Sequence, residues 1–78
     1  MGLEQFLTEE DKTAALQKLI KLLSVDVYTL CLRAGIDPDT FDYADYSAPT
    51  DGLIHPYATE LEARSRSLAA AEAKLNGL

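Results

Sequence analysis

Apolar residues recur every three or four positions along the first part of the chain, which is the spacing of one face of an α-helix. This spacing predicts a helix over about residues 8–23, with an apolar face made of Leu16, Leu19, Ile20 and Leu23. Thr8 has a side chain suited to capping its start, and acidic residues follow in the first turn, where the helix dipole favours negative charge. Asp11, three residues after Thr8, completes a weak form of the capping box.

A second stripe with the same spacing follows directly. It predicts another helix over about residues 25–34, with Ser24 as its N-cap. Gly35 stands after this helix, where a left-handed conformation is needed, and Ile36 can supply the apolar contact that closes a Schellman motif. The chain is therefore expected to turn sharply at Gly35.

Two more helices are expected after this corner. Asp37 can cap a third helix over about residues 38–45, because the proline that follows it is tolerated at the first helical position. Proline, aspartate and glycine then predict a loop over residues 47–55. The last helix is expected over about residues 56–75, and it is one of the two long helices.

These elements predict an all-α fold. Residues 1–78 should form one domain, a small bundle of three to four helices with a helix-turn-helix-like corner and a long C-terminal helix. A chain of this length buries a small fraction of its surface. Its sequence has neither a disulfide framework nor a metal-binding cluster to compensate. Stability should therefore depend on good helix caps and packing, on oligomerisation, or on docking to a partner.

The chain is acidic, with 13 acidic and 7 basic residues and a net charge of −6. The excess lies in residues 24–56, which carry six aspartates and a single base, Arg33. An acidic surface repels nucleic acids and anionic membranes. No stretch reaches the roughly 20 apolar residues of a membrane-spanning helix, and the first residues lack the pattern of a signal peptide. These observations predict a cytoplasmic protein without membrane contact.

A more specific pattern surrounds the corner. A small residue precedes the glycine by four positions, an aliphatic residue follows it, and an apolar residue comes six positions after it. These residues are Cys31, Gly35, Ile36 and Phe41, with Ala44 as a further packing position. The pattern resembles the helix-turn-helix of phage-repressor-like regulators over residues 24–46. The resemblance implies a DNA-binding transcription regulator, dimeric through the last helix.

The charges of this segment depart from that family. A DNA-reading helix presents basic and amide side chains to bases and phosphates. The corresponding residues here are aspartates, namely Asp37, Asp39, Asp42 and Asp45. Because affinity for duplex DNA comes largely from neutralising its phosphates, this composition argues against direct nucleic-acid binding.

The same segment combines aspartate with tyrosine. Tyrosine offers rigid contact area with a polar tip and is enriched at interfaces, while the aspartates suit a basic partner. The predicted partner-binding residues are Asp39, Asp42, Tyr43, Asp45 and Tyr46. The equally weighted alternative is an ordinary solvated face with half-buried tyrosines.

The predicted last helix carries leucines at intervals of seven, Leu61, Leu68 and Leu75. This spacing is typical of a coiled-coil seam and suggests self-association through the C-terminal helix. The favoured alternative is that the same stripe packs on the helices that precede it, because a small domain needs that apolar surface.

Catalysis has little support in the sequence. His55, the only histidine, falls in a predicted loop, and Cys31 lies on an apolar helix face, where a thiol is usually inert packing. Counted from Asp37, the sixth position lacks the glycine and the twelfth lacks the glutamate of a calcium-binding loop. We expect no enzymatic activity, no cofactor and no metal site.

The sequence therefore favours a non-enzymatic protein-interaction module with an acidic surface that docks on a basic protein partner. Small size, acidity and the repressor-like corner suggest an assembly subunit of a phage or mobile element, or an inhibitor of a nucleic-acid-binding protein. The alternative is the helix-turn-helix DNA-binding regulator.

Overall fold

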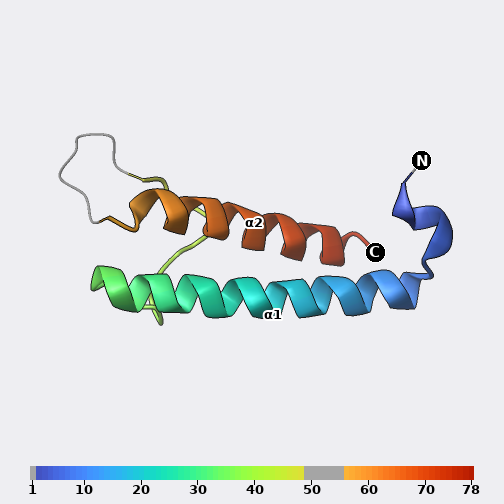
Figure 1. Cartoon of the computed structure of the whole chain (residues 1–78), viewed down its shortest axis with the longest axis horizontal. Coiled ribbons are helices and arrows are strands. Elements are labelled where there is room, and N and C mark those ends of the chain that lie inside the picture. Colours follow the sequence, from blue (N-terminus) through green and yellow to red (C-terminus); the bar gives the residue numbers. More distant parts are fainter. Residues whose placement is uncertain (1, 49–55) are drawn as a thin grey trace.

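The computed structural model describes residues 2–48 and 56–78. A short 3₁₀-helix, η1 (Leu3–Phe6), precedes two α-helices, α1 (Glu9–Ala34) and α2 (Ala58–Asn76). The two α-helices run antiparallel and side by side, and α1 is the longer (Figure 1). The expected all-α class is confirmed, but the expected bundle of three to four helices is wrong, because the described residues form a two-helix hairpin.

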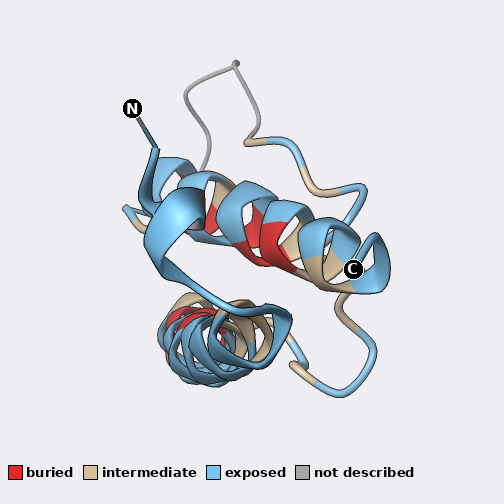
Figure 2. Ribbon diagram, turned by 90° about the vertical axis from the view of Figure 1, so that its right-hand side faces the viewer, coloured by how far each residue is buried: buried red, intermediate tan, exposed pale blue. Residues whose placement is uncertain are grey.

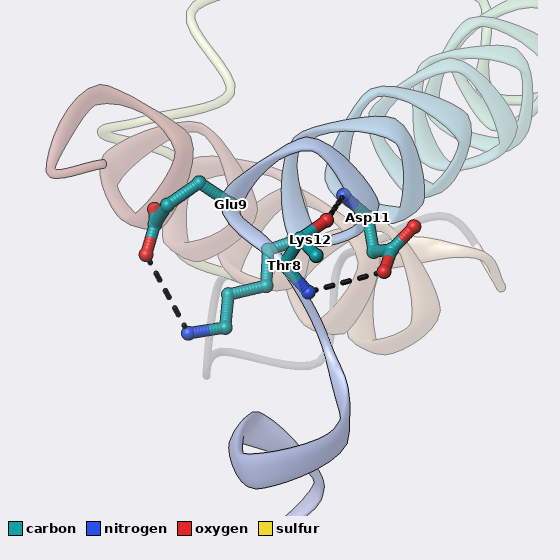
Figure 3. A network of polar contacts seen from close by, with 4 residues as sticks. All are labelled: Thr8, Glu9, Asp11 and Lys12. Atoms are coloured by element: carbon teal, nitrogen blue, oxygen red, sulfur yellow. Dashed lines mark hydrogen bonds and ion pairs between the residues drawn. The ribbon is translucent and has the colours of Figure 1, made fainter.

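The start of α1 is capped as the sequence predicts. The hydroxyl of Thr8 accepts a hydrogen bond from the backbone N–H of Asp11 at 3.1 Å, and the carboxylate of Asp11 accepts one from the N–H of Thr8 at 3.0 Å. Lys12 adds a 3.7 Å ion pair with Glu9 (Figure 3). This reciprocal capping box satisfies two backbone donors that the first turn would otherwise leave unpaired.

The break expected at Ser24 does not occur, and the two predicted helices are one. The buried residues on either side of Ser24 are Leu23 and Val27, which are four positions apart. The two stripes are therefore a single continuous stripe, and packing of that stripe on α2 favours an unbroken helix over a cap at Ser24.

The Schellman motif at the end of α1 is confirmed. Gly35 has φ 76° and ψ 20°, in the left-handed region. Its N–H donates to the carbonyl of Leu32 at 3.3 Å, and the N–H of Ile36 donates to the carbonyl of Cys31 at 2.9 Å. Ile36 packs against the core, so the motif turns the chain back toward the hairpin.

The third helix, expected over residues 38–45, is absent, and with it the helix-turn-helix-like corner. Asp37 does accept a hydrogen bond, from the N–H of Asp39 at 3.0 Å, but turns follow instead of a helix. Aspartate, threonine and aromatic residues are poor helix formers, and a helix this short is marginal without tertiary support. In this chain the tertiary contacts are made by Phe41, Tyr43 and Tyr46. They pack on the core while the backbone that carries them is irregular rather than helical.

The last helix is close to its expected position but starts at Ala58 rather than Pro56. Residues 49–55, which include His55 and most of the expected loop, lie outside the described residues. Neither α1 nor α2 is long and apolar enough to cross a membrane.

The core lies between α1 and α2, whose buried residues are on the sides that face each other (Figure 2). The buried residues of α1 are Leu23, Val27, Leu30 and Cys31, and those of α2 are Ala58, Leu61, Ser65, Leu68 and Ala71. Alanine and serine alternate with leucine along α2, so the two helices can approach closely at the small positions. Leu61 and Leu68 are thus buried inside the hairpin, and Leu75 is half-buried. These leucines therefore pack within the chain and do not form an exposed stripe for self-association.

Candidate functional site

Residues 36–48, here called the acidic segment, connect the Schellman turn to the end of the described first part of the chain. Three aromatic side chains hold this segment on the hairpin, and all three are partly buried against the core. The rings of Phe41 and Tyr46 lie 5.1 Å apart at 55°, a tilted arrangement that favours the ring quadrupoles. The segment is therefore packed on the body along its length.

Tyr43 adds a polar tether to this packing. Its hydroxyl donates a hydrogen bond to the carboxylate of Glu72 on α2, 29 positions later in the chain. The pKa of Tyr43 is raised, chiefly by this hydrogen bond and further by burial and by the negative charges of Glu72 and Asp42. The protonated hydroxyl is thus the stable form, and it ties the acidic segment to the last turns of α2.

Tyr46 is held mainly by burial. Burial raises the pKa of its hydroxyl, with smaller contributions from the nearby charge of Glu62 and from Cys31. Glu62 in turn accepts a hydrogen bond from Arg66 at 2.9 Å on the surface of α2. Phe41, Tyr43 and Tyr46 therefore face inward and act as anchors rather than as free contact residues.

The carboxylates of the acidic segment face outward. Asp37, Asp39, Asp42 and Asp45 are all exposed, and the segment contains no basic residue. Of the five residues predicted to contact a partner, the structure thus presents Asp39, Asp42 and Asp45 to solvent and partly buries Tyr43 and Tyr46. The predicted site is in this way divided into exposed charges and inward-facing anchors.

Glu72 and Glu62 are neighbours of this site that sequence reasoning missed. They lie on α2 and come close to Tyr43 and Tyr46 only because the acidic segment folds back over the hairpin. No local pattern connects residues so far apart in the chain. Glu72 adds a carboxylate beside the acidic segment, whereas the charge of Glu62 is balanced by Arg66.

A second feature missed by sequence reasoning is the face of α1 that points away from α2. It exposes large apolar side chains, namely Leu22, Val25, Tyr28 and Leu32. A signal for this face was present, because Leu22, Val25 and Leu32 have the i, i+3, i+10 spacing of one helix face. It was hidden by the expected break at Ser24, which divides the stripe between two helices.

A third feature lies where η1 meets the open end of the hairpin. A cavity of about 380 Å³ there has Lys12 and Lys74 at its edge and is lined mainly by apolar side chains, namely Leu3, Leu7, Ala15, Leu16 and Leu78. Lys12 is already paired with Glu9. The cavity has apolar walls but no converging set of polar groups that would orient a ligand.

The remaining reactive groups do not gather into a site. Burial raises the pKa of the Cys31 thiol, which is fully buried in the core. Within residues 2–48 and 56–78, no group of three or more histidine, cysteine, aspartate or glutamate side chains is placed to hold a metal ion. No protein-family model, curated protein or solved structure matches this chain at a significant level, so its own residues carry the functional argument.

Proposed function

We propose that this chain is a non-enzymatic protein-interaction module whose acidic segment docks on a basic protein surface. One observation carries the proposal: an irregular segment is packed on the hairpin by three aromatic side chains while its carboxylates face solvent. A solvated linker with no partner does not need such anchoring. The anchors also reduce the entropy that the carboxylates would lose on binding.

The charge pattern supports a basic partner. Asp39, Asp42 and Asp45 lie on one short segment, with Glu72 beside its Tyr43 anchor. Negative charge concentrated in this way steers a positively charged partner and fixes its orientation more than it adds raw affinity. A Lys/Arg-rich protein surface, such as one that binds nucleic acid, has the complementary charge.

The test is a binding titration with a fluorescent Lys/Arg-rich peptide, read by anisotropy at low and at physiological salt. The test variant is D39N/D42N/D45N. Asp37 is left unchanged, because its carboxylate accepts the N–H of Asp39 and shapes the turn. The matched control is E9Q/E10Q/E60Q, which removes the same charge from exposed positions elsewhere on the hairpin.

We expect the test variant to bind about tenfold more weakly, since three exposed carboxylates at about 0.5 kcal/mol each amount to roughly 1.5 kcal/mol. The control should bind within about twofold of the wild type. Equal loss in both variants would mean that only net charge matters, and the proposed site would be wrong.

A labelled DNA duplex is the second ligand of the same titration. The DNA-binding alternative needs a recognition helix, and the acidic segment is not helical among the described residues. Binding to the duplex at low salt, without binding to the peptide, would overturn the proposed function in favour of that alternative.

A further inference from the structure

The outer face of α1, defined as Leu22, Val25, Tyr28, Thr29 and Leu32, carries four large apolar side chains that are exposed in the described part of the chain. The exposed fractions are 57% for Leu22, 57% for Val25, 51% for Tyr28 and 58% for Leu32. In Figure 2, which looks along α1, α2 lies on one side of the helix and its far side is exposed. Single exposed apolar residues are ordinary, but a row along one helix face marks an interaction surface.

The hairpin itself explains why this row stays open. A helix that is apolar on two opposite sides needs neighbours on both. In the described part of the chain only α2 packs along α1, and it covers the side that carries Leu23, Val27 and Leu30. The outer face therefore requires something outside this hairpin to cover it.

The outer face is hollowed along one edge. A hollow of about 290 Å³ is lined by Lys21, Ser24, Val25, Tyr28 and Thr29. Val25 and Thr29 lie on one side of this hollow, and Lys21, Ser24 and Tyr28 complete it. The hydroxyl of Thr29 is already bonded to the carbonyl of Val25 at 2.8 Å, which leaves its methyl group for packing.

We propose that the covering partner is a second copy of this chain, with the two α1 helices packed in parallel. Leu22, Val25, Thr29 and Leu32 then form the a and d positions of a short coiled-coil seam. In this register each seam residue packs beside its own copy. This interface is distinct from the acidic segment and does not depend on the proposed function.

The flanking charges select the second copy and the parallel direction. In a parallel coiled coil, the residue just before each a position, called g, contacts the e residue of the other helix. That e residue lies five positions later in the sequence. Lys21 then meets Asp26 of the second copy, and Tyr28 meets Arg33 of the second copy. The first contact is an ion pair and the second is a cation–π contact, and each occurs twice by symmetry. An antiparallel pair centred on the same seam brings Asp26 near Asp26 and loses these contacts.

The seam is short, and this sets the strength of the dimer. It covers two heptads, and the preceding seam position is Lys18, whose charge would face its own copy. Interfaces below about 1,200 Å² are typical of transient complexes. The dimer should therefore be weak and should form reversibly as the protein concentration rises.

The experiment is sedimentation velocity of the whole chain from about 10 μM to 1 mM, the range in which weak interfaces assemble. We expect the mass to rise with concentration from 8.5 kDa toward twice that value. Leu22→Glu should keep the chain monomeric throughout. Leu78→Glu is the matched control, because Leu78 is also exposed, at 49%, but lies beyond the C-terminal end of α2 and away from the outer face.

A charge swap tests the direction of packing. Lys21→Glu alone should weaken dimerisation about tenfold or more, and K21E/D26K should restore it to near the wild-type level. Circular dichroism should show that all variants stay helical, since the changed residues are exposed. A wild type that is monomeric at 1 mM, or a dimer that survives Leu22→Glu, would overturn the proposal. Failure of the swap to restore dimerisation would overturn the parallel arrangement.

Discussion

The two sides of α1 carry similar apolar side chains, but one side is buried against α2 and the other is exposed to solvent. Leu22 and Leu23 are neighbours in sequence, yet Leu22 is 57% exposed and Leu23 is 6% exposed. The difference arises because α2 lies on one side of α1 only (Figure 1). Apolar content therefore does not decide which face of a helix is core; the direction in which the returning helix docks decides it.

This comparison suggests a division of roles. The inner face stabilises the fold, because it meets the leucines of α2 and the aromatic anchors of the acidic segment. The outer face is exposed, so we expect it to contribute little to the stability of one chain. If the proposed parallel dimer forms, both acidic segments lie at the same end of the assembly, where one partner could be bound by two sites at once.

The largest expected effect comes from truncating the two neighbouring leucines separately. Leu23→Ala removes a buried side chain and leaves a cavity, which should lower the free energy of unfolding by about 2–5 kcal/mol. Leu22→Ala removes an exposed side chain and should change it by less than about 0.5 kcal/mol. Urea denaturation at low micromolar concentration, where the proposed dimer is dissociated, measures both.

The comparison of the two faces would fail if both substitutions cost the same. In that case, the outer face would already be covered within one chain. Leu22→Ala should also lose stability at high protein concentration relative to the wild type, because only the wild type gains from association.

A smaller effect is expected at the tether between the acidic segment and α2. Tyr43→Phe keeps the ring on the core but removes the hydrogen bond to Glu72, and it should lower stability by about 1 to 1.5 kcal/mol. The pKa of Tyr43 is raised in the folded chain, so this contribution is complete at neutral pH. It is lost as the pH rises above about 10, the ordinary tyrosine value, and through the raised pKa.

Urea unfolding of the wild type and of Tyr43→Phe, repeated from neutral to strongly alkaline pH, measures how much this hydrogen bond contributes to stability. The difference between the two proteins should shrink as Tyr43 ionises. A difference that stays constant with pH would show that the hydroxyl does not hold the segment.

The smallest effect concerns a polar group on the α2 side of the core. Ser65 is fully buried, and its hydroxyl has no hydrogen-bond partner among the described residues. Ser65→Ala removes this desolvated group and should raise stability by up to about 1 kcal/mol, or about 4–8 °C in Tm. Thermal unfolding at fixed protein concentration reads the shift. A drop in Tm would mean that the hydroxyl is satisfied in solution.

Features built from near neighbours in the chain were predictable. The capping box of Thr8 and Asp11 and the left-handed Gly35 are decided within five residues, so their sequence signals suffice. The inner stripe was also visible, although it was divided in two at Ser24. Serine is favoured at helix starts, but a cap preference of about 1 kcal/mol is overcome when packing continues across it.

The acidic segment shows the limit of local signals. Asp37 was expected to cap a helix, but its carboxylate accepts the N–H of Asp39 within a turn, and no helix follows. The helix expected to follow was wrong because Phe41, Tyr43 and Tyr46 gain more from reaching the core than from local hydrogen bonds. The aspartates were identified as exposed candidates, whereas the inward role of the tyrosines depends on Glu72 and α2.

The sequence by itself determined the helical class, the caps at Thr8 and Gly35, and the acidity of the middle third. These properties depend on the periodicity of side chains, on hydrogen bonds within one turn, and on a count of charges. Only the tertiary structure decided that α1 is continuous, that Leu61 and Leu68 are core, and that Leu22, Val25 and Leu32 are exposed. Each of these outcomes depends on where α2 packs against α1, which local interactions do not set.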